Sequence, residues 1–338
     1  MLVENDKSLQ QLNTFGIAAS AKYFAEINSL DELGELIGDS KFKSEKKLVL
    51  GGGSNILFTK NFDGLVIKNN FKGIEILKED AHHAWIKVAA GEDWHTFVLF
   101  CVERNLAGME NLSLIPGLTG AAPMQNIGAY GVEVKETGEE VEAHHLITGE
   151  KFLLRNSDCE FGYRESVFKN RYKNQFFISS VTFKLNKIFK PKINYGDIRK
   201  TLEDMRAEDI TIKTVSDAVI KIRSSKLPDP KVIGNAGSFF KNPVVLKKKF
   251  EELILKNPLM PNYADKNNQV KIPAGWLIEQ CGWKGKRIGN TGAHAKQSLV
   301  LVNYGGATGE EIITLAKEIQ QSVMEKFGVE ILVEVNVV

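Results

Sequence analysis

Residues 47–58 read KLVLGGGSNILF, an apolar strand that runs into three glycines and resumes as a second apolar run. Three glycines followed by serine and asparagine let several backbone N–H groups point at one place, which suits a phosphate group. The loop is neither a P-loop nor a Rossmann fingerprint, because the spaced glycines and the following helix are both missing. Taken alone, the stretch favours a hairpin turn over a phosphate site.

A second segment, residues 115–131, reads IPGLTGAAPMQNIGAYG and is nearly free of bulky polar side chains. It is too rich in glycine and proline for a regular core element, and its bare backbone suits the close approach of a large flat ligand. Gln125 and Asn126 can offer amide donors and acceptors to the polar edge of that ligand. The alternative is a packed turn region between two subdomains. Two such segments in one N-terminal domain favour a cofactor of dinucleotide size.

A third stretch, residues 227–243, reads LPDPKVIGNAGSFFKNP and has the character of a site rather than a scaffold. Its prolines fix the backbone, and Gly237 leaves space beside Ser238 for a ligand. Phe239 and Phe240 anchor that serine against an apolar surface, and nearby lysines and an asparagine offer donors to an anion. The alternative is a surface loop closed by two buried aromatic side chains.

In residues 161–166 (FGYRES), Arg164 lies near two aromatic residues, Phe161 and Tyr163. A guanidinium in that setting can hold a carboxylate through two hydrogen bonds and stays charged throughout. The alternative is an exposed ion pair with Glu165. Residues 192–197 (KINYGD) place Tyr195 on a turn, where an ordinary turn tyrosine is the alternative.

The composition is that of a soluble globular chain of 338 residues, long enough for two or three domains. Its 44 Lys and Arg residues nearly balance 42 Asp and Glu residues, so we expect neither nucleic acid nor anionic lipid as a partner. No apolar run has the length of a membrane span, and the polar start lacks the apolar core of a signal peptide. Three widely spaced cysteines and scattered histidines predict neither a disulfide framework nor a metal site. We therefore expect a cytoplasmic location.

Hydrophobic periodicity predicts an α+β fold with mixed sheets. Strands are expected at residues 47–50, 64–68, 85–89, 141–147 and 176–185. Capping residues predict three helices, which begin after Ser29, after Asp93 and after Thr308. The second is expected to end near Gly108 and the third at Gly328. A short helix is also expected at 217–224. Residues 329–338 alternate as a final strand, with Glu334 on the face opposite the valines. A domain junction is expected where the composition turns charged, at about 186–213.

Together these motifs closely resemble the UDP-N-acetylenolpyruvoylglucosamine reductase (MurB) family, in its type I group. The resemblance lies at residues 13–16, 51–55, 115–117, 125–131, 161–164, 226–230 and 234–243, in the family's order, and extends to the last strand. It implies an FAD-binding domain of the vanillyl-alcohol-oxidase (PCMH) type over residues 1–190, in two α/β subdomains of about 1–70 and 71–190. A junction with the tyrosine loop at 191–213 and an α+β substrate-binding domain at 214–338 would follow.

The resemblance implies NADPH-dependent, FAD-mediated reduction of the enolpyruvyl group of UDP-N-acetylglucosamine enolpyruvate to UDP-N-acetylmuramate, in peptidoglycan precursor synthesis. FAD would be held non-covalently, NADPH would be the co-substrate, and the protein would act as a monomer without a metal.

Roles for single residues are also implied by the resemblance. Arg164 would face the substrate carboxylate, Ser238 would donate the proton, and Glu334 would lie near that carboxylate. The predicted cofactor-binding residues are Gly51, Gly52, Gly53, Ser54, Asn55, Ile115, Pro116, Gly117, Gln125, Asn126, Gly128 and Ala129. The predicted substrate-binding residues are Tyr163, Tyr195, Lys226, Asn242, Tyr263 and Gln297, with Tyr195 closing over the nucleotide sugar and Lys226 and Asn242 on its diphosphate.

Three other functions stay open from the residues themselves. A flavin oxidase of the same cofactor fold often tethers FAD through histidine or cysteine, and neither residue occurs at 51–55 or 115–131. A hydrolase using Ser238 and Lys226 would leave both glycine-rich segments unexplained. A nucleotide-sugar-binding module would bind FAD without oxidising NADPH.

Overall fold

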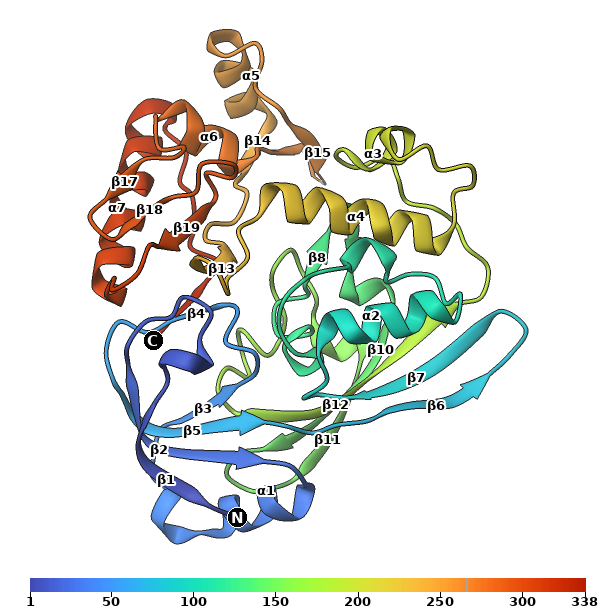
Figure 1. Ribbon diagram of the computed structural model, residues 1–338, viewed down its shortest axis with the longest axis vertical. Helices are drawn as coiled ribbons and strands as arrows, with labels where there is room; N and C mark the ends of the chain where they lie inside the picture. The colour runs from blue at the N-terminus through green and yellow to red at the C-terminus, as the bar shows by residue number, and fades with distance from the viewer. Residues whose placement is uncertain (266) are drawn as a thin grey trace. The chain divides into compact units, whose positions relative to one another are not determined.

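The computed structural model describes residues 1–265 and 267–338. It divides into two compact units (Figure 1). Unit 1 comprises Met1–Lys7, Ala21–Gly52 and Phe62–Ser225, and unit 2 comprises Ser8–Ser20, Gly53–Asn61 and Lys226–Val338. The main division therefore lies later in the chain than the junction expected at 191–213. The limits of the functional domains stay a prediction.

The first sheet of unit 1 has four strands in the order β1-β2-β5-β3. They are β1 (Val3–Ser8), β2 (Ser20–Ile27), β5 (Phe62–Asn69) and β3 (Lys47–Leu50), and β2, β5 and β3 run parallel. Helix α1 (Leu30–Gly38) follows β2 and begins as predicted, because the Ser29 side chain accepts a hydrogen bond from Glu32 N at 3.2 Å. Leu33 and Leu36 of α1 pack in a common core with the buried residues of β2 and β5.

The second sheet of unit 1 is antiparallel, with five strands in the order β11-β10-β12-β7-β6. They are β6 (Ile74–Glu79), β7 (His83–Ala89), β10 (Gly138–His145), β11 (Lys151–Arg155) and β12 (Phe176–Asn186), which confirms the three strands predicted here to within a few residues. Helix α2 (Trp94–Glu103) is capped by Asp93 and ends before the predicted limit near Gly108. It packs on the sheet through Phe97, whose ring lies 4.9 Å from that of Phe183.

Two helices occupy the charged stretch before the main division. Helix α3 (Ile198–Asp204) and helix α4 (Ile212–Lys226) share one buried apolar cluster of unit 1. The helix expected at 217–224 is therefore wrong in its length, because α4 begins earlier and ends later. Helix α3 and the start of α4 lie within the stretch expected to be a junction. The apolar residues of α3 and α4 are spaced one helical turn apart, so the charged residues between them hid the pattern.

Unit 2 contains an antiparallel sheet in the order β13-β19-β18-β17. Its strands are β13 (Gly234–Ser238), β17 (Arg287–Ile288), β18 (Thr291–Ala293) and β19 (Val300–Asn303). Helix α7 (Gly309–Phe327) has the predicted capping box of Thr308 and Glu311 and ends at Gly328 in the left-handed conformation, as expected. The unit also contains β14 (Val244–Leu246), α5 (Lys247–Lys256), β15 (Tyr263–Asp265), β16 (Gln269–Lys271) and α6 (Ala274–Gln280).

The final strand expected at 329–338 is wrong. Only Val333, in an isolated bridge with Phe240, and β20 (Asn336–Val337), which pairs in parallel with β4 (Ile56–Leu57), have β structure. The alternation breaks because the chain leaves Phe240 to pair with β4. As a result, Glu334 and its neighbour Val335 are both buried.

Candidate active site

Within unit 1, the backbone of Gly52, in the first glycine-rich segment, lies against the backbone of Gly117, in the second. A Cβ atom on Gly52 would lie only 2.9 Å from Gly117 Cα, so no side chain fits between them. The backbone of Gly117 is itself fixed, since its carbonyl accepts a hydrogen bond from Trp94 N at 3.0 Å. The structure therefore brings together residues that the sequence places 65 positions apart (117 − 52).

The segment at 115–131 is held by its own amide side chains as well as by neighbouring strands. Asn126 is fully buried, donates to Gly162 O at 2.9 Å and to Glu133 Oε2 at 3.1 Å, and accepts from Lys135 N at 2.9 Å. Its amide thus shapes the loop, and its contact with a cofactor stays a prediction. Gln125 Oε1 lies 3.5 Å from Lys169 Nζ.

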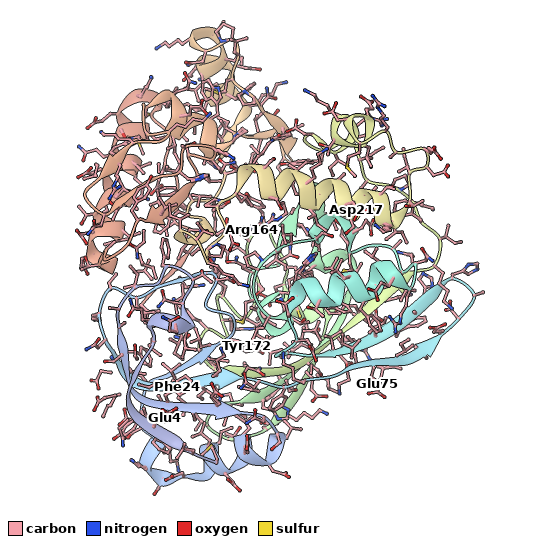
Figure 2. The ribbon with its side chains drawn as sticks, viewed as in Figure 1. Glu4, Phe24, Glu75, Arg164, Tyr172 and Asp217 are labelled. Carbon is pink, nitrogen blue, oxygen red and sulfur yellow. The ribbon has the colours of Figure 1, made fainter. Side chains whose placement is uncertain are left out.

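Arg164, labelled in Figure 2, contacts this segment through its guanidinium. Its backbone is left-handed, with φ 56°, and its guanidinium donates to Gly128 O at 2.6 Å. The same guanidinium lies 5.5 Å from the Tyr163 ring centroid. Because the turn at 161–165 is also tied to Asn126, the structure places Tyr163 and Arg164 beside the predicted cofactor segment.

A second guanidinium lies close by, and the sequence analysis missed it. Arg223 on α4 donates to Leu114 O at 3.1 Å, directly before the segment, and hydrogen-bonds Tyr130 at its other end. Burial lowers the pKa of Arg223, the contact with Tyr130 opposes that shift, and the nearby charge of Arg164 adds to it. The signal for this residue was its position one turn after the buried Val219, on the apolar face of α4.

Leu114, the residue just before the segment, is held through its backbone N–H as well as through its carbonyl. It has a left-handed backbone, with φ 58°, and its N–H donates to His95 Nδ1 at 3.0 Å. Burial lowers the pKa of His95, which favours the neutral ring needed to accept this bond.

In unit 2, Ser238 ends strand β13, so the alternative of a surface loop is wrong for this part of 227–243. The pairing of β13 with β19 shifts between Asn235 and Ser238, and Gly237 within that bulge has φ 70°. Asn235 Oδ1 accepts from Gly237 N at 3.0 Å and so fixes the bulge. Bulges of this kind re-aim the next side chain, here Ser238. Phe239 and Phe240 are buried, as expected.

Glu334 lies on the segment that pairs with the residues just after Ser238. Its N–H donates to Phe239 O at 2.8 Å, and its side chain is 8% exposed. Two of the three predicted catalytic residues therefore come from neighbouring backbone segments of unit 2.

Two predicted substrate residues meet at the first turn of α6. Asn242 Oδ1 accepts from Ala274 N at 2.9 Å, and Gln297 Oε1 lies 2.9 Å from where a Cβ of Gly275 would be. Lys226 is the exposed last residue of α4, and Tyr263 is 38% exposed on β15.

Across residues 1–265 and 267–338, no helix is both long and apolar enough to cross a lipid bilayer. The same residues contain no cluster of three or more His, Cys, Asp or Glu side chains able to hold a metal ion.

Comparison with known proteins identifies both parts of the chain. Residues 229–338 match the family model described as the C-terminal domain of UDP-N-acetylenolpyruvoylglucosamine reductase, and residues 21–150 match an FAD binding domain. A UDP-N-acetylenolpyruvoylglucosamine reductase of Flavobacterium johnsoniae is 51% identical over 100% of both chains.

Two solved structures share the fold. UDP-N-acetylenolpyruvylglucosamine reductase of Thermus caldophilus superposes with a TM-score of 0.67 at 23% identity, over 100% of this chain and 99% of the other. 6-Hydroxy-D-nicotine oxidase of Arthrobacter nicotinovorans gives 0.50 at 11% identity, over 97% and 86%. These likenesses show the fold alone, and it is the predicted one: α+β, with an FAD-binding domain of the vanillyl-alcohol-oxidase type.

The residues present fit FAD. Backbone packed against backbone at Gly52 and Gly117 leaves surfaces without side chains, as a flat cofactor with a diphosphate needs. The guanidinium groups of Arg164 and Arg223 lie beside the second segment and suit the negative charge of the FAD diphosphate. From its sequence, its fold and these donors, the chain belongs to the UDP-N-acetylenolpyruvoylglucosamine reductase family of FAD-dependent oxidoreductases in cell-wall synthesis.

Proposed function

We propose that this chain uses NADPH to reduce the enolpyruvyl group of UDP-N-acetylglucosamine enolpyruvate to UDP-N-acetylmuramate, with Ser238 as proton donor. FAD, when bound, supplies the hydride carrier between NADPH and the enolpyruvyl double bond. The chain's own residues hold the cofactor, orient the substrate and move the proton. A monomer in the cytoplasm is part of the same proposal.

The two glycine-rich segments would hold the cofactor. Residues 51–55 would bind the FAD pyrophosphate through backbone N–H groups, and residues 115–131 would line the flavin. The close approach of Gly52 to Gly117 supports this assignment.

Arg164 would activate the substrate. An enolpyruvyl double bond accepts a hydride poorly unless its carboxylate withdraws electron density, and a fixed guanidinium opposite that carboxylate stabilises the enolate-like charge of the transition state. The observation that carries this proposal is the placement of Arg164, held at 2.6 Å from Gly128 O beside a second cation, Arg223. A guanidinium fixed before the substrate arrives needs no reorganisation during the reaction.

Ser238 and Glu334 would complete the addition. One carbon of the double bond gains the hydride, and the other gains the proton of the Ser238 hydroxyl, which solvent then restores. The bulge at Gly237 supports this role because bulges change the direction in which the next side chain of the strand points. Glu334, protonated or sharing a proton, would lie near the substrate carboxylate.

The remaining substrate contacts follow the same assignment. Tyr195 would close over the nucleotide sugar, Lys226 and Asn242 would bind its diphosphate, and Tyr163, Tyr263 and Gln297 would add further contacts. The shared position of Asn242 and Gln297 at the first turn of α6 supports a joint role for these two.

The test separates the two half-reactions by stopped-flow flavin absorbance. In Ser238→Ala, we expect NADPH to reduce the flavin at nearly the wild-type rate, whereas reoxidation by the enolpyruvyl substrate slows about 10²-fold or more. An equal loss in both half-reactions would remove Ser238 from the proton-donor role. Ser157→Ala, at an exposed serine of unit 1, is the control and should change neither rate.

A further inference from the structure

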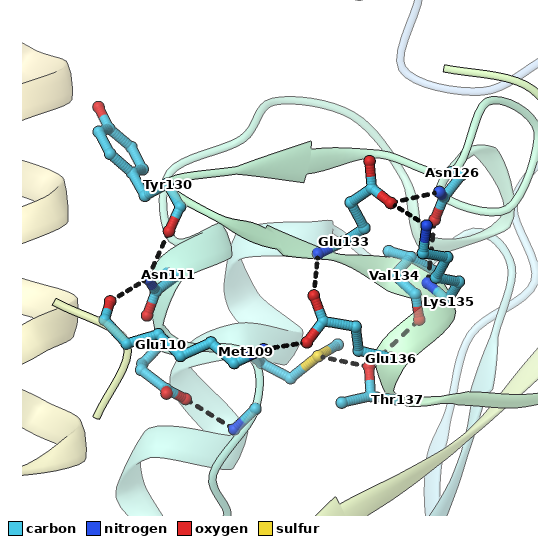
Figure 3. A network of polar contacts seen from close by, with 12 residues as sticks. Met109, Glu110, Asn111, Asn126, Tyr130, Glu133, Val134, Lys135, Glu136 and Thr137 are labelled. Atoms are coloured by element: carbon cyan, nitrogen blue, oxygen red, sulfur yellow. Dashed lines mark hydrogen bonds and ion pairs between the residues drawn. The ribbon is translucent and has the colours of Figure 1, made fainter. Parts of the chain in front are cut away.

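One buried amide of unit 1 joins two segments to which the proposed function gives different tasks (Figure 3). Asn111 is fully buried, and its Nδ2 donates to Tyr130 O at 2.9 Å and to Lys192 O at 2.8 Å. Tyr130 lies at the end of the segment assigned to the flavin, and Lys192 begins the turn that carries Tyr195.

The same two segments also pack on each other reciprocally. A Cβ on Gly196 would lie 3.7 Å from the Tyr130 ring, and a Cβ on Gly131 would lie 3.4 Å from Tyr195 Cβ. Each tyrosine thus covers the glycine next to the other. An ion pair between Lys192 and Glu136 adds a further tie at the base of the turn.

Asn111 links the two segments through the N–H donors of its side-chain amide. Within the described part of the chain, its Oδ1 has no hydrogen-bond partner, so both recorded bonds of the amide run to the two carbonyls. A side chain without donors would leave both carbonyls facing a group that cannot pair with them. The turn at 192–197 would then lose the link to Tyr130 O that Asn111 provides.

We propose that Asn111 is a positioning residue for reduction of the enolpyruvyl nucleotide: it holds the Tyr195 turn in place on the segment assigned to the flavin. The inference rests on the proposed role of Tyr195 as a substrate contact. Asn111 acts on the nucleotide through Tyr195, so its loss weakens nucleotide binding and leaves the NADPH half-reaction intact.

The test is Asn111→Leu in the FAD-loaded protein, because leucine has a similar size and no donor. We expect the KM for the enolpyruvyl nucleotide to rise about tenfold, with flavin reduction by NADPH within about twofold of wild type. Asn156→Leu is the matched control, since Asn156 Nδ2 also donates to two carbonyls of unit 1, Lys135 O at 2.8 Å and Gly138 O at 2.6 Å. It should leave that KM unchanged.

A second readout does not depend on turnover. Hydrogen–deuterium exchange of the FAD-loaded protein should be faster at residues 192–197 in Asn111→Leu and unchanged there in Asn156→Leu. Should Asn111→Leu not fold, Asn111→Asp serves instead, because an ionised carboxylate cannot donate either bond. Unchanged exchange together with an unchanged KM would overturn the inference.

Tyr195→Ala separates this inference from the function beneath it. In that background, Asn111→Leu should raise the KM no further. A normal KM in Tyr195→Ala contradicts the role assigned to Tyr195, and so the proposed function at that residue. If the KM is raised in Tyr195→Ala but normal in Asn111→Leu, the inference about Asn111 is overturned and the proposed role of Tyr195 stands.

Discussion

Glu142 on β10 shows how one side chain can bind several elements of unit 1 together. Its carboxylate lies 3.0 Å from Lys87 Nζ of β7 and 2.9 Å from Lys151 Nζ of β11, and it accepts from Ser179 Oγ of β12 at 2.9 Å. His144 lies 3.7 Å away on the same strand. Burial raises the pKa of Glu142, but the hydrogen bonds from Lys151, Lys87 and Ser179 outweigh it and bring the pKa down to about 2.

This shift predicts how stability depends on pH. A carboxyl whose folded pKa is lowered stabilises the fold fully above its unfolded value of 4.5 and loses that contribution as the pH falls towards about 2. We therefore expect Glu142→Gln to lower the free energy of unfolding by at most about 3 kcal/mol at neutral pH, and by progressively less as the solution is acidified.

Urea unfolding at a series of pH values measures this difference. Glu139→Gln, at an exposed glutamate of the same strand, is the control and should cost little at any pH. A Glu142→Gln deficit that stayed constant from neutral pH down to about pH 3 would contradict the assignment.

At the scale of elements, the bulge in β13 is the feature on which the placement of Ser238 depends. Gly237 has φ 70° and open space where a Cβ would be, so alanine fits there sterically but opposes the backbone conformation. We expect Gly237→Ala to slow flavin reoxidation by the substrate at least about tenfold, because the bulge relaxes and Ser238 turns away, while reduction by NADPH stays near wild type.

Gly289→Ala is the matched control. Gly289 also lies in unit 2 with φ 55° and open space, at the turn between β17 and β18, so it carries a similar backbone strain without touching β13. If both variants slowed reoxidation equally, the effect would come from general destabilisation rather than from Ser238.

The elements predicted correctly are those whose signals are local. Helices α1 and α7 carry their own caps at Ser29 and Thr308, and the strands predicted in unit 1 contain alternating or consecutive apolar residues. The errors arose where tertiary contacts decide. Strand pairing with β4 redirects the chain after Val333. In the first turn of α4, Ile212 packs in the core of the five-stranded sheet and Val215 packs in the cluster shared with α3.

At the scale of the whole molecule, the order of the motifs was enough to predict the family, because the glycine-rich loops and the Ser238 motif are made of distinctive residue types that are contiguous in the sequence. The residues that hold those motifs were missed. Arg223 and Asn111 act through carbonyls of Leu114, Tyr130 and Lys192, and any residue type can supply a carbonyl. A backbone partner leaves no trace in the sequence.

The last prediction concerns how the chain keeps its cofactor. A covalent flavin is often tethered through histidine or cysteine, and residues 51–55 and 115–131 contain neither residue type. The cysteines of unit 1 are poor nucleophiles as well, because burial raises the pKa of Cys101 well above its usual range and that of Cys159 to about 12. Denaturation should therefore release all of the flavin, which ultrafiltration would then separate from the protein. A fluorescent band at the mass of the chain on a denaturing gel, beside a covalent flavoprotein as positive control, would instead place this chain with the oxidases in its mode of holding FAD.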